Sequence, residues 1–178
     1  GAEHVETVMG FPRYWDGDYW NFKIDEFIAN NKFHLTKAKA RRKGFSYKRG
    51  SQAANTINLF PNVTVTLAAD QLAYLTDKGA TTFMAKKCLD HFEEHTFWKR
   101  GYISEAIDDI LMGYRVSTKG LKNFGWLSNL YSVAIGKNES AAVGKKAIEI
   151  DFEEAGKCPN LQKALDVTLS NTESGAIS

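Results

Sequence analysis

The sequence contains little cysteine, little proline and no long apolar run, and each scarcity excludes a class of protein. Two cysteines, Cys88 and Cys158, in 178 residues cannot provide a disulfide framework, so the chain must fold by burying an apolar core. Whether the two thiols form one bridge stays open. Three prolines are compatible with many helices. No stretch approaches the roughly 18 apolar residues of a membrane-spanning helix.

Acidic residues are absent from a long part of the chain. Between Phe27 and Ala69 the sequence has eight Lys or Arg and no Asp or Glu. Because the formal net charge is +2, this stretch carries +8 and the rest carries −6 by subtraction from the same sequence. Cations this dense repel one another unless water or an anion surrounds them. The sequence therefore predicts a polarised molecule with a basic segment at residues 32–49.

An anionic partner for this basic segment is the main functional prediction. Nucleic acid, an acidic protein surface and an anionic membrane surface all fit the charge. A solvated basic face without a partner is the alternative. The aromatic rings of Phe45 and Tyr47 add possible stacking groups for bases. The predicted anion-binding residues are Lys32, Lys37, Lys39, Arg41, Arg42, Lys43, Lys48 and Arg49.

The composition predicts one folded domain covering residues 1–178. The chain is 43% hydrophobic and 25% charged, which argues against extensive disorder. The first part, residues 1–30, is rich in aromatic residues and is expected to be largely irregular, with a short helix around Phe27 that ends at Asn30 and Asn31. The last part, residues 170–178, is a polar tail expected to dock on the domain or on a neighbouring chain.

Apolar periodicity predicts an α+β fold dominated by helices, with five or six helices. Alternation over 55–67 predicts a small sheet. Residues 147–153 predict a strand with one polar face, and the alternative is a helix that begins at Ser140 and continues through them. Helical spacing predicts an amphipathic helix over 84–92, another over 103–114 and a last one over 161–169. Residues 121–135 are apolar on nearly all sides, which predicts the central buried helix around which the others pack.

A short string contains candidate metal ligands. Residues 91–95 read H-x-x-E-H, and Cys88 precedes His91 by one helical turn. The string resembles the motif of the pitrilysin-like zinc hydrolases, and this resemblance implies His91 and His95 as zinc ligands with Glu94 as the general base. The alternative is a helix whose histidines lie on its polar flank while Cys88 faces the core.

No other catalytic pattern is complete. The sequence contains no G-x-S-x-G, Walker or dinucleotide-binding glycine motif. We therefore expect a non-catalytic structural or assembly subunit that contacts protein neighbours, holds an anionic partner through its basic segment and needs no cofactor. The alternatives are an RNA or single-stranded nucleic-acid-binding protein, such as a nucleocapsid or coat protein, and a zinc-dependent hydrolase.

Overall fold

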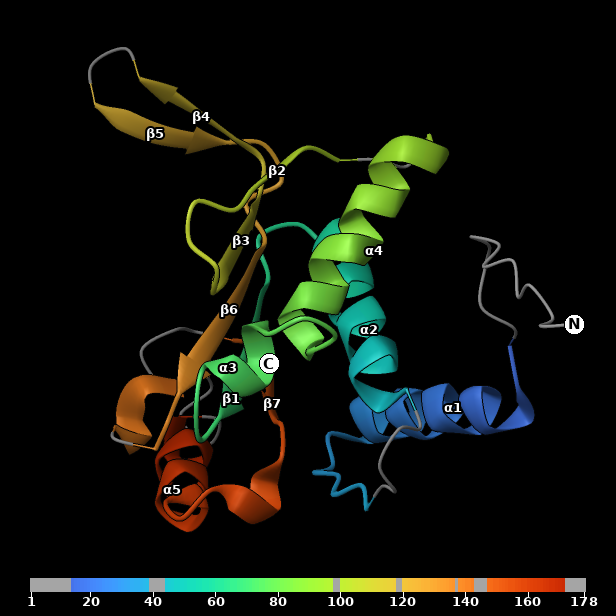
Figure 1. Ribbon diagram of the computed structural model, residues 1–178, viewed down its shortest axis with the longest axis vertical. Coiled ribbons are helices and arrows are strands. Elements are labelled where there is room, and N and C mark those ends of the chain that lie inside the picture. The colour runs from blue at the N-terminus through green and yellow to red at the C-terminus, as the bar shows by residue number, and fades with distance from the viewer. Residues whose placement is uncertain are drawn as a thin grey trace, which may run out of the picture. The chain divides into compact units, whose positions relative to one another are not determined.

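A computed structural model (Figure 1) describes residues 14–38, 44–97, 100–117, 120–136, 138–142 and 147–171. The chain divides into two compact units, Gly1–Lys43 and Gly44–Ser178. We describe each unit by itself.

The first unit contains one described helix, α1 (Asp16–Asn31). Its start is fixed by Asp18, whose carboxylate accepts a hydrogen bond of 2.9 Å from the backbone N–H of Trp15. Its end is fixed by Lys32, which adopts a left-handed conformation with φ of 55°. The predicted end at Asn31 is confirmed. The expected irregular structure before Ile24 is wrong from Asp16 onward, because the helix already begins there.

The second unit is built on a five-stranded mixed sheet with the order β2-β3-β6-β1-β7. The strands β1 (Thr64–Ala69), β6 (Asn129–Ala134) and β7 (Glu149–Phe152) are parallel. The strands β2 (Tyr102–Ile103) and β3 (Asp109–Met112) extend the sheet in the antiparallel sense beyond β6. β7 forms one edge of this sheet.

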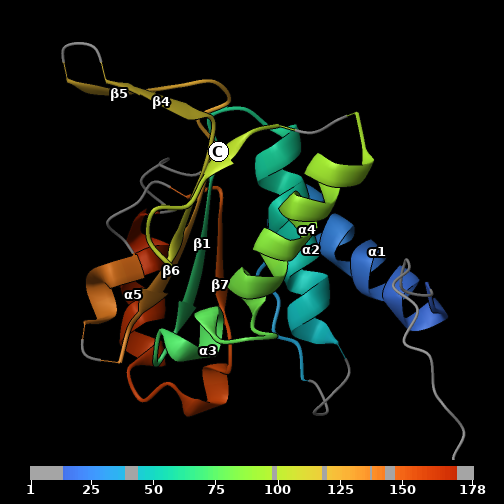
Figure 2. The same ribbon diagram turned by 45° about the horizontal axis from the view of Figure 1, so that its top comes forward.

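Helices cover both faces of the sheet (Figures 1 and 2). One face of β1, carrying Val65 and Leu67, packs in a core with α2 (Phe45–Leu59) and α4 (Thr81–His95). The opposite face, carrying Ala68, packs in a second core with α5 (Leu161–Asn171). This alternation follows from the twofold period of strand side chains. Because β1 is buried on both faces, it lies at the centre of an α/β/α arrangement.

Short elements complete the second unit. α3 (Ala73–Thr76) precedes α4, while η1 (Glu139–Ala142) and η2 (Ala155–Lys157) are single 3₁₀ turns. A separate two-stranded sheet pairs β4 (Tyr114–Ser117) with β5 (Leu121–Phe124). Figure 1 shows this β4–β5 hairpin extending beyond the main sheet.

The predicted helix-dominated fold is wrong. The described residues form four helices of 11 to 16 residues and one of four, together with seven strands. The expected central helix over 121–135 is instead β5 and β6, and the expected helix over 103–114 contains β3. Gly125 and Leu127, with φ of 106° and 60°, interrupt any helix there. β6 has no exposed polar face, because its residues up to Val133 are buried or half-buried between the helices on the two faces of the sheet.

The predicted small sheet at 55–67 is also wrong in its first half. Residues 55–59 belong to α2, whose Ala53, Ala54 and Ile57 face the core at helical spacing. Only the part from Thr64 onward is a strand. The strand predicted over 147–153 is confirmed as β7, and the helices predicted over 84–92 and 161–169 are confirmed as parts of α4 and α5.

Two further predictions concern membranes and the tail. None of the helices described by the structure combines the length and the apolar character that crossing a membrane requires. The tail from residue 172 onward lies outside the described residues, so its predicted docking stays a prediction.

Candidate functional site

The first component of the candidate site is the N-terminus of α2. The helix is capped by Gly44 in a left-handed conformation, with φ of 68° and no side-chain hydrogen bond to the first backbone N–H groups. Its first turn carries no acidic residue. The N-terminus of a helix attracts anions through its unpaired N–H groups and its dipole. The local geometry therefore favours a bound anion at Gly44.

The position of this helix end follows from the chain path. The other end of α2 leads directly into β1, and Ser128 Oγ holds this junction by donating to Phe60 O and accepting from Val63 N–H. The N-terminus of α2 consequently lies toward the carboxyl end of β1. In open α/β sheets, ligands bind beyond the carboxyl ends of the parallel strands.

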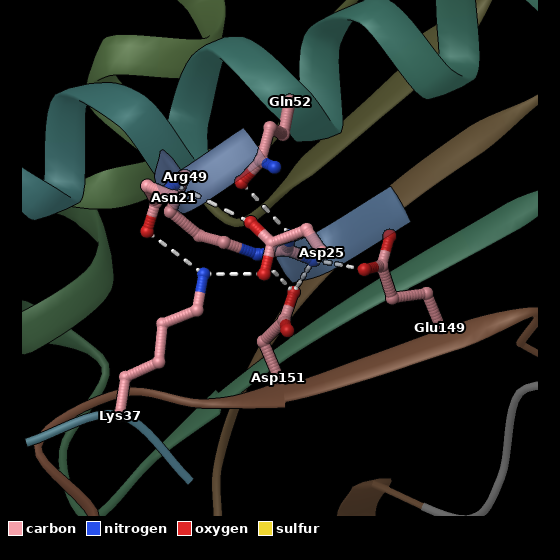
Figure 3. Close-up of polar contacts among 7 residues, drawn as sticks. All are labelled: Asn21, Asp25, Lys37, Arg49, Gln52, Glu149 and Asp151. Atoms are coloured by element: carbon pink, nitrogen blue, oxygen red, sulfur yellow. Dashed lines mark hydrogen bonds and ion pairs between the residues drawn. The ribbon is translucent and has the colours of Figure 1, made fainter. Parts of the chain in front are cut away.

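The second component is an ion-pair network between α2 and β7 (Figure 3). Arg49 Nε donates to Asp151 Oδ2 over 2.6 Å, and Arg49 Nη2 forms ion pairs with Asp151 and, at 2.5 Å, with Glu149 Oε1. Arg49 Nη1 donates to Gln52 Oε1 over 3.2 Å. The Arg49 side chain is only 16% exposed, so its guanidinium is a structural clamp between the helix and the edge strand.

This network alters the protonation of Asp151. Burial of the carboxyl group raises its pKa from 3.8 to about 7, and the carboxylates of Glu149 and Glu153 add to the rise. The guanidinium of Arg49 opposes the rise without cancelling it. Burial lowers the pKa of Arg49 itself, but Asp151 and Glu149 more than reverse this effect, so the guanidinium remains charged. One cation therefore serves two carboxyl groups.

The third component is a pair of glutamates directly after β7. Glu153 follows the strand, and its Oε1 accepts a hydrogen bond of 2.8 Å from Thr81 Oγ1 at the start of α4. Glu154 comes next, with a left-handed φ of 50° and an ion pair of 3.2 Å to Lys157. Both glutamates therefore lie at the carboxyl end of a parallel strand.

A close helix crossing holds these components together. Gly50 in α2 is buried against α4, where an added Cβ would lie 2.6 Å from the carbonyl oxygen of Thr81. Only glycine allows the two helix backbones to approach so closely. Because Thr81 also binds Glu153, this crossing fixes the start of α4 and the end of β7 relative to α2.

The loops that follow β1 and β6 are joined at the same end of the sheet. The backbone N–H of Gly136 donates to Asp70 O over 3.1 Å, and Asn160 Nδ2 donates to Gly136 O over 3.1 Å. A Cβ on Gly136 would lie 2.5 Å from Asp70 Oδ1. A further carboxyl group, that of Asp70, therefore lies at the carboxyl end of the parallel strands.

The structure places only some of the predicted anion-binding residues. Lys39, Arg41, Arg42 and Lys43 lie outside the described residues, and Lys32 is exposed at the end of α1. Lys37 forms an ion pair with Asp25 and donates to Asn21 Oδ1 over 2.9 Å within the first unit (Figure 3).

The remaining predicted residues belong to α2. Lys48 Nζ lies 5.4 Å from the centre of the Phe45 ring, and Tyr47 is 39% exposed. Burial raises the pKa of the Tyr47 hydroxyl. The carboxylates of β7 hold Arg49, so its charge, like that of Lys37, is matched within the chain.

The candidate zinc ligands lie on α4 but do not form a metal centre with a third group. The rings of His91 and His95 are 4.5 Å apart between centroids. Cys88 packs against the core, and burial raises the pKa of its thiol to about 11. Within the described ranges, no group of three or more His, Cys, Asp and Glu side chains could hold a metal ion. Cys88 and Cys158 are both free thiols.

Sequence reasoning missed the carboxylates of β7 as site residues. The sequence predicts this strand with a polar face but indicates no role for Asp151, Glu153 or Glu154. The available signal was a short alternating strand that ends in two consecutive glutamates. The functional meaning of these glutamates depends on the parallel sheet, which the residue pattern does not reveal.

Comparisons with known proteins do not assign this site. No protein-family description matches the chain, and neither the curated proteins nor the solved structures provided a significant match.

Proposed function

We propose that the chain binds a nucleoside triphosphate together with Mg²⁺ at the carboxyl end of its parallel strands, and that it hydrolyses the terminal phosphate. One observation carries the proposal. The glycine-capped N-terminus of α2 lies at the same end of the sheet as the glutamates after β7, and Arg49 links the two elements. An anion site beside carboxylates suits a ligand that combines phosphates with a divalent cation.

The sequence before α2 supports phosphate binding. Arg41, Arg42 and Lys43 directly precede Gly44. Residues 39–46 read K-A-R-R-K-G-F-S, which shares its second glycine and its final serine with the phosphate-loop pattern G-x-x-x-x-G-K-[ST]. It departs from that pattern at Lys39 and Phe45, so the positive charge that the pattern's lysine supplies would come from the cations that precede Gly44 in the sequence. In this proposal, the anionic partner that the sequence predicts for the basic segment is the polyphosphate of a nucleotide.

The carboxylates supply the other half of the chemistry. A magnesium ion bound to phosphates needs only one or two protein oxygen ligands, and it would neutralise charge on the β- and γ-phosphates. The hydroxyl oxygen of Ser46 and a carboxylate oxygen of Glu153 would serve as these ligands. Glu154 would accept a proton from the water that attacks the γ-phosphorus, while the bond to the leaving nucleoside diphosphate breaks.

The binding experiment uses the whole chain and a fluorescent ATP analogue with Mg²⁺. We expect saturable binding that Mg²⁺-ATP displaces and that Lys163→Gln, an exposed change on α5, leaves unaltered. Replacing Arg42 and Lys43 together by Gln should weaken binding at least tenfold, because two charge-assisted contacts to phosphate are lost. Absence of binding at millimolar nucleotide would refute the proposal.

The hydrolysis experiment separates binding from chemistry. Glu154→Gln should retain nucleotide binding and reduce phosphate release by roughly 100-fold or more, the size expected for loss of a general base. Glu94→Gln, on the exposed side of α4, is the control and should match the wild-type rate. Equal rates for both variants would exclude Glu154 as the base.

An assembly subunit remains the second proposed function, and three exposed aromatic residues, one at the N-cap of α1 and two within the helix, favour it. Trp15, Trp20 and Phe27 are 66%, 63% and 59% exposed, which is unusual for residues that normally find partly buried sites. A protein neighbour would cover such rings. Native mass spectrometry should then show a complex that the double variant Trp20→Ser and Phe27→Ser loses, and monomers at all accessible concentrations would refute this role.

A further inference from the structure

The β4–β5 hairpin and the segment beside its base bring together two parts of the chain that are both basic and aromatic. The backbone N–H of Gly113 donates to Gly101 O over 2.8 Å, and Tyr102 pairs with Met112 across β2 and β3. The start of β2 and the base of the hairpin are therefore neighbours. We propose that this hairpin surface, formed by the described residues of 100–103 and 113–126, binds single-stranded nucleic acid, which goes beyond the proposed nucleotide site.

The charge of the hairpin surface favours a polyanion. Residues 100–103 and 113–126 contain no Asp or Glu. Arg115 pairs with Glu105 from the intervening loop, and its Nε donates to Asn123 Oδ1 over 2.9 Å. Lys122 is exposed. A nucleic-acid backbone, with one phosphate per nucleotide, is a polyanion that separated cations of this kind can bind. Because Glu105 matches the charge of Arg115, Arg100 and Lys122 are the described cations of this surface that can meet a phosphate.

A stacked pair of rings provides a platform for bases. Tyr114 and Phe124 face each other across the hairpin with ring centroids 5.9 Å apart and an interplanar angle of 21°. They are 58% and 42% exposed, outside both cores. Unpaired bases stack on exposed aromatic rings of this kind.

Two glycines hold the base of the hairpin in place. Gly113 and Gly125 have φ of 150° and 106°, values that other residues rarely adopt. A Cβ on Gly113 would overlap the backbone oxygen of Phe124. The two strands therefore leave the main sheet together, and Tyr114 and Phe124 are presented on a defined turn of the backbone instead of a free loop.

Arg100 and Trp126 add hydrogen-bonding groups next to the hairpin. The guanidinium carbon of Arg100 lies 3.4 Å from the centre of a Trp126 ring, and Arg100 Nε donates to Asn58 O over 2.8 Å. Trp126 Nε1 and Asn58 Oδ1 are buried without a partner in the described part of the chain. Asn58 is only 4% exposed. Buried polar atoms normally have a partner, often an ordered water, and we expect such a water at these two atoms beside the hairpin surface.

The combination selects single-stranded nucleic acid over an acidic protein or a duplex. An acidic protein would satisfy the cations but would not require exposed stacked rings, and a duplex keeps its bases stacked inside. The hairpin surface adjoins the end of α2 that carries Asn58, whereas the proposed phosphate site adjoins the end that carries Gly44. The two ligands can therefore bind at the same time.

The test measures binding of the full chain to fluorescein-labelled oligo(dT) of about 20 nucleotides, longer than the site of a single binding fold, by anisotropy. Tyr114→Ala and Phe124→Ala should each weaken binding by roughly fivefold or more, the loss expected for one stacked base. Tyr19→Ala, a ring of similar exposure in the first unit, is the matched control and should bind as the wild type. Circular dichroism and thermal melting confirm that each variant is folded.

Two further readouts distinguish the possible ligands. Lys122→Gln should reduce the slope of log affinity against log salt by about 0.7, the value for one phosphate contact on a single strand. Photo-crosslinking of an iodouracil oligonucleotide should label the peptides that contain Tyr114 or Phe124. Hairpin variants that bind as tightly as the Tyr19→Ala control, crosslinks confined to residues 32–49, or equal competition by polyglutamate would overturn the proposal.

Discussion

Replacing Gly50 by alanine tests how the candidate phosphate site is held together. In an exposed helix this change would stabilise α2 by about 1 kcal/mol through helix propensity. Here the new Cβ would lie 2.6 Å from Thr81 O and 2.9 Å from Ala85 N. Both obstacles are backbone atoms, so α2 and α4 must move apart. Overpacking of this kind costs roughly 1–3 kcal/mol before any compensation.

We expect a net loss of about 1–2 kcal/mol in the free energy of unfolding, which lowers Tm by about 2–8 °C in a protein of this size. Gly17→Ala is the control, because no atom lies within 4 Å of its added Cβ. Differential scanning calorimetry measures both variants. Nucleotide affinity should fall together with the stability of Gly50→Ala, since the start of α4 moves away from α2. A Gly50→Ala protein as stable as the wild type would refute the close crossing.

Further predictions concern buried polar groups. The pKa of Asp151 is about 7 in the folded state against 3.8 ordinarily, so between these pH values the folded protein binds a proton that the unfolded chain lacks. The free energy of unfolding should therefore fall as pH rises from 3.8 to 7, with a slope of up to about 1.4 kcal/mol per pH unit. Urea titrations should show that this slope vanishes in Asp151→Asn and persists in the exposed control Asp77→Asn. Thr66→Val should stabilise the protein by about 1 kcal/mol, because Thr66 Oγ1 is buried without a partner among the described residues. Thr82→Val should instead destabilise it by a similar amount, because its Oγ1 is 2.5 Å from Ser132 Oγ, and equal effects of the two changes would contradict the hydrogen-bond assignments.

Elements with one buried face were predictable from the sequence. In α4, Met84, Cys88 and Phe92 recur at helical spacing, and the last two pack against the core. The strand β7 alternates apolar and acidic residues. Each element has a polar side that makes its period visible. The strand β7 and the helices α4 and α5 were therefore recognised before the fold was known.

The strand β6, whose residues up to Val133 are buried or half-buried on both faces, is not predictable in this way. β6 reads N-L-Y-S-V-A, with Leu130 in one core and Val133 against the other. No polar face remains to show a twofold period, so the same residues are compatible with a buried helix. Because residues 121–135 are predicted as a helix, the predicted fold lacks the strand β6 and with it the parallel sheet. Without that sheet, nothing in the sequence places the glutamates after β7 at the same end of the fold as the N-terminus of α2.

The candidate site was hidden for a related reason. In the sequence, Arg49 is one of eight cations in an acid-free stretch, and its charge suggests an external partner. In the structure its partner is Asp151, 102 residues away. Only tertiary contacts separate a cation that holds two elements together from cations that can meet a ligand.

The polarity of the sheet explains why the proposed phosphate site and the proposed nucleic-acid surface have different chemistry. The helices α2 and α4 both begin at the carboxyl end of β1. The positive ends of their dipoles therefore lie at the same end of the sheet as the acidic residues that follow β7. That end can neutralise phosphates and a cation together. At the other end α2 finishes beside Trp126, where the exposed rings and cations come from stretches that contain no Asp or Glu, residues 100–103 and 113–126. These two stretches supply no carboxylate for a divalent cation, but their rings and cations can bind bases and single phosphates. The two ends of the sheet therefore differ as expected if nucleotide hydrolysis and single-strand binding occur on one domain.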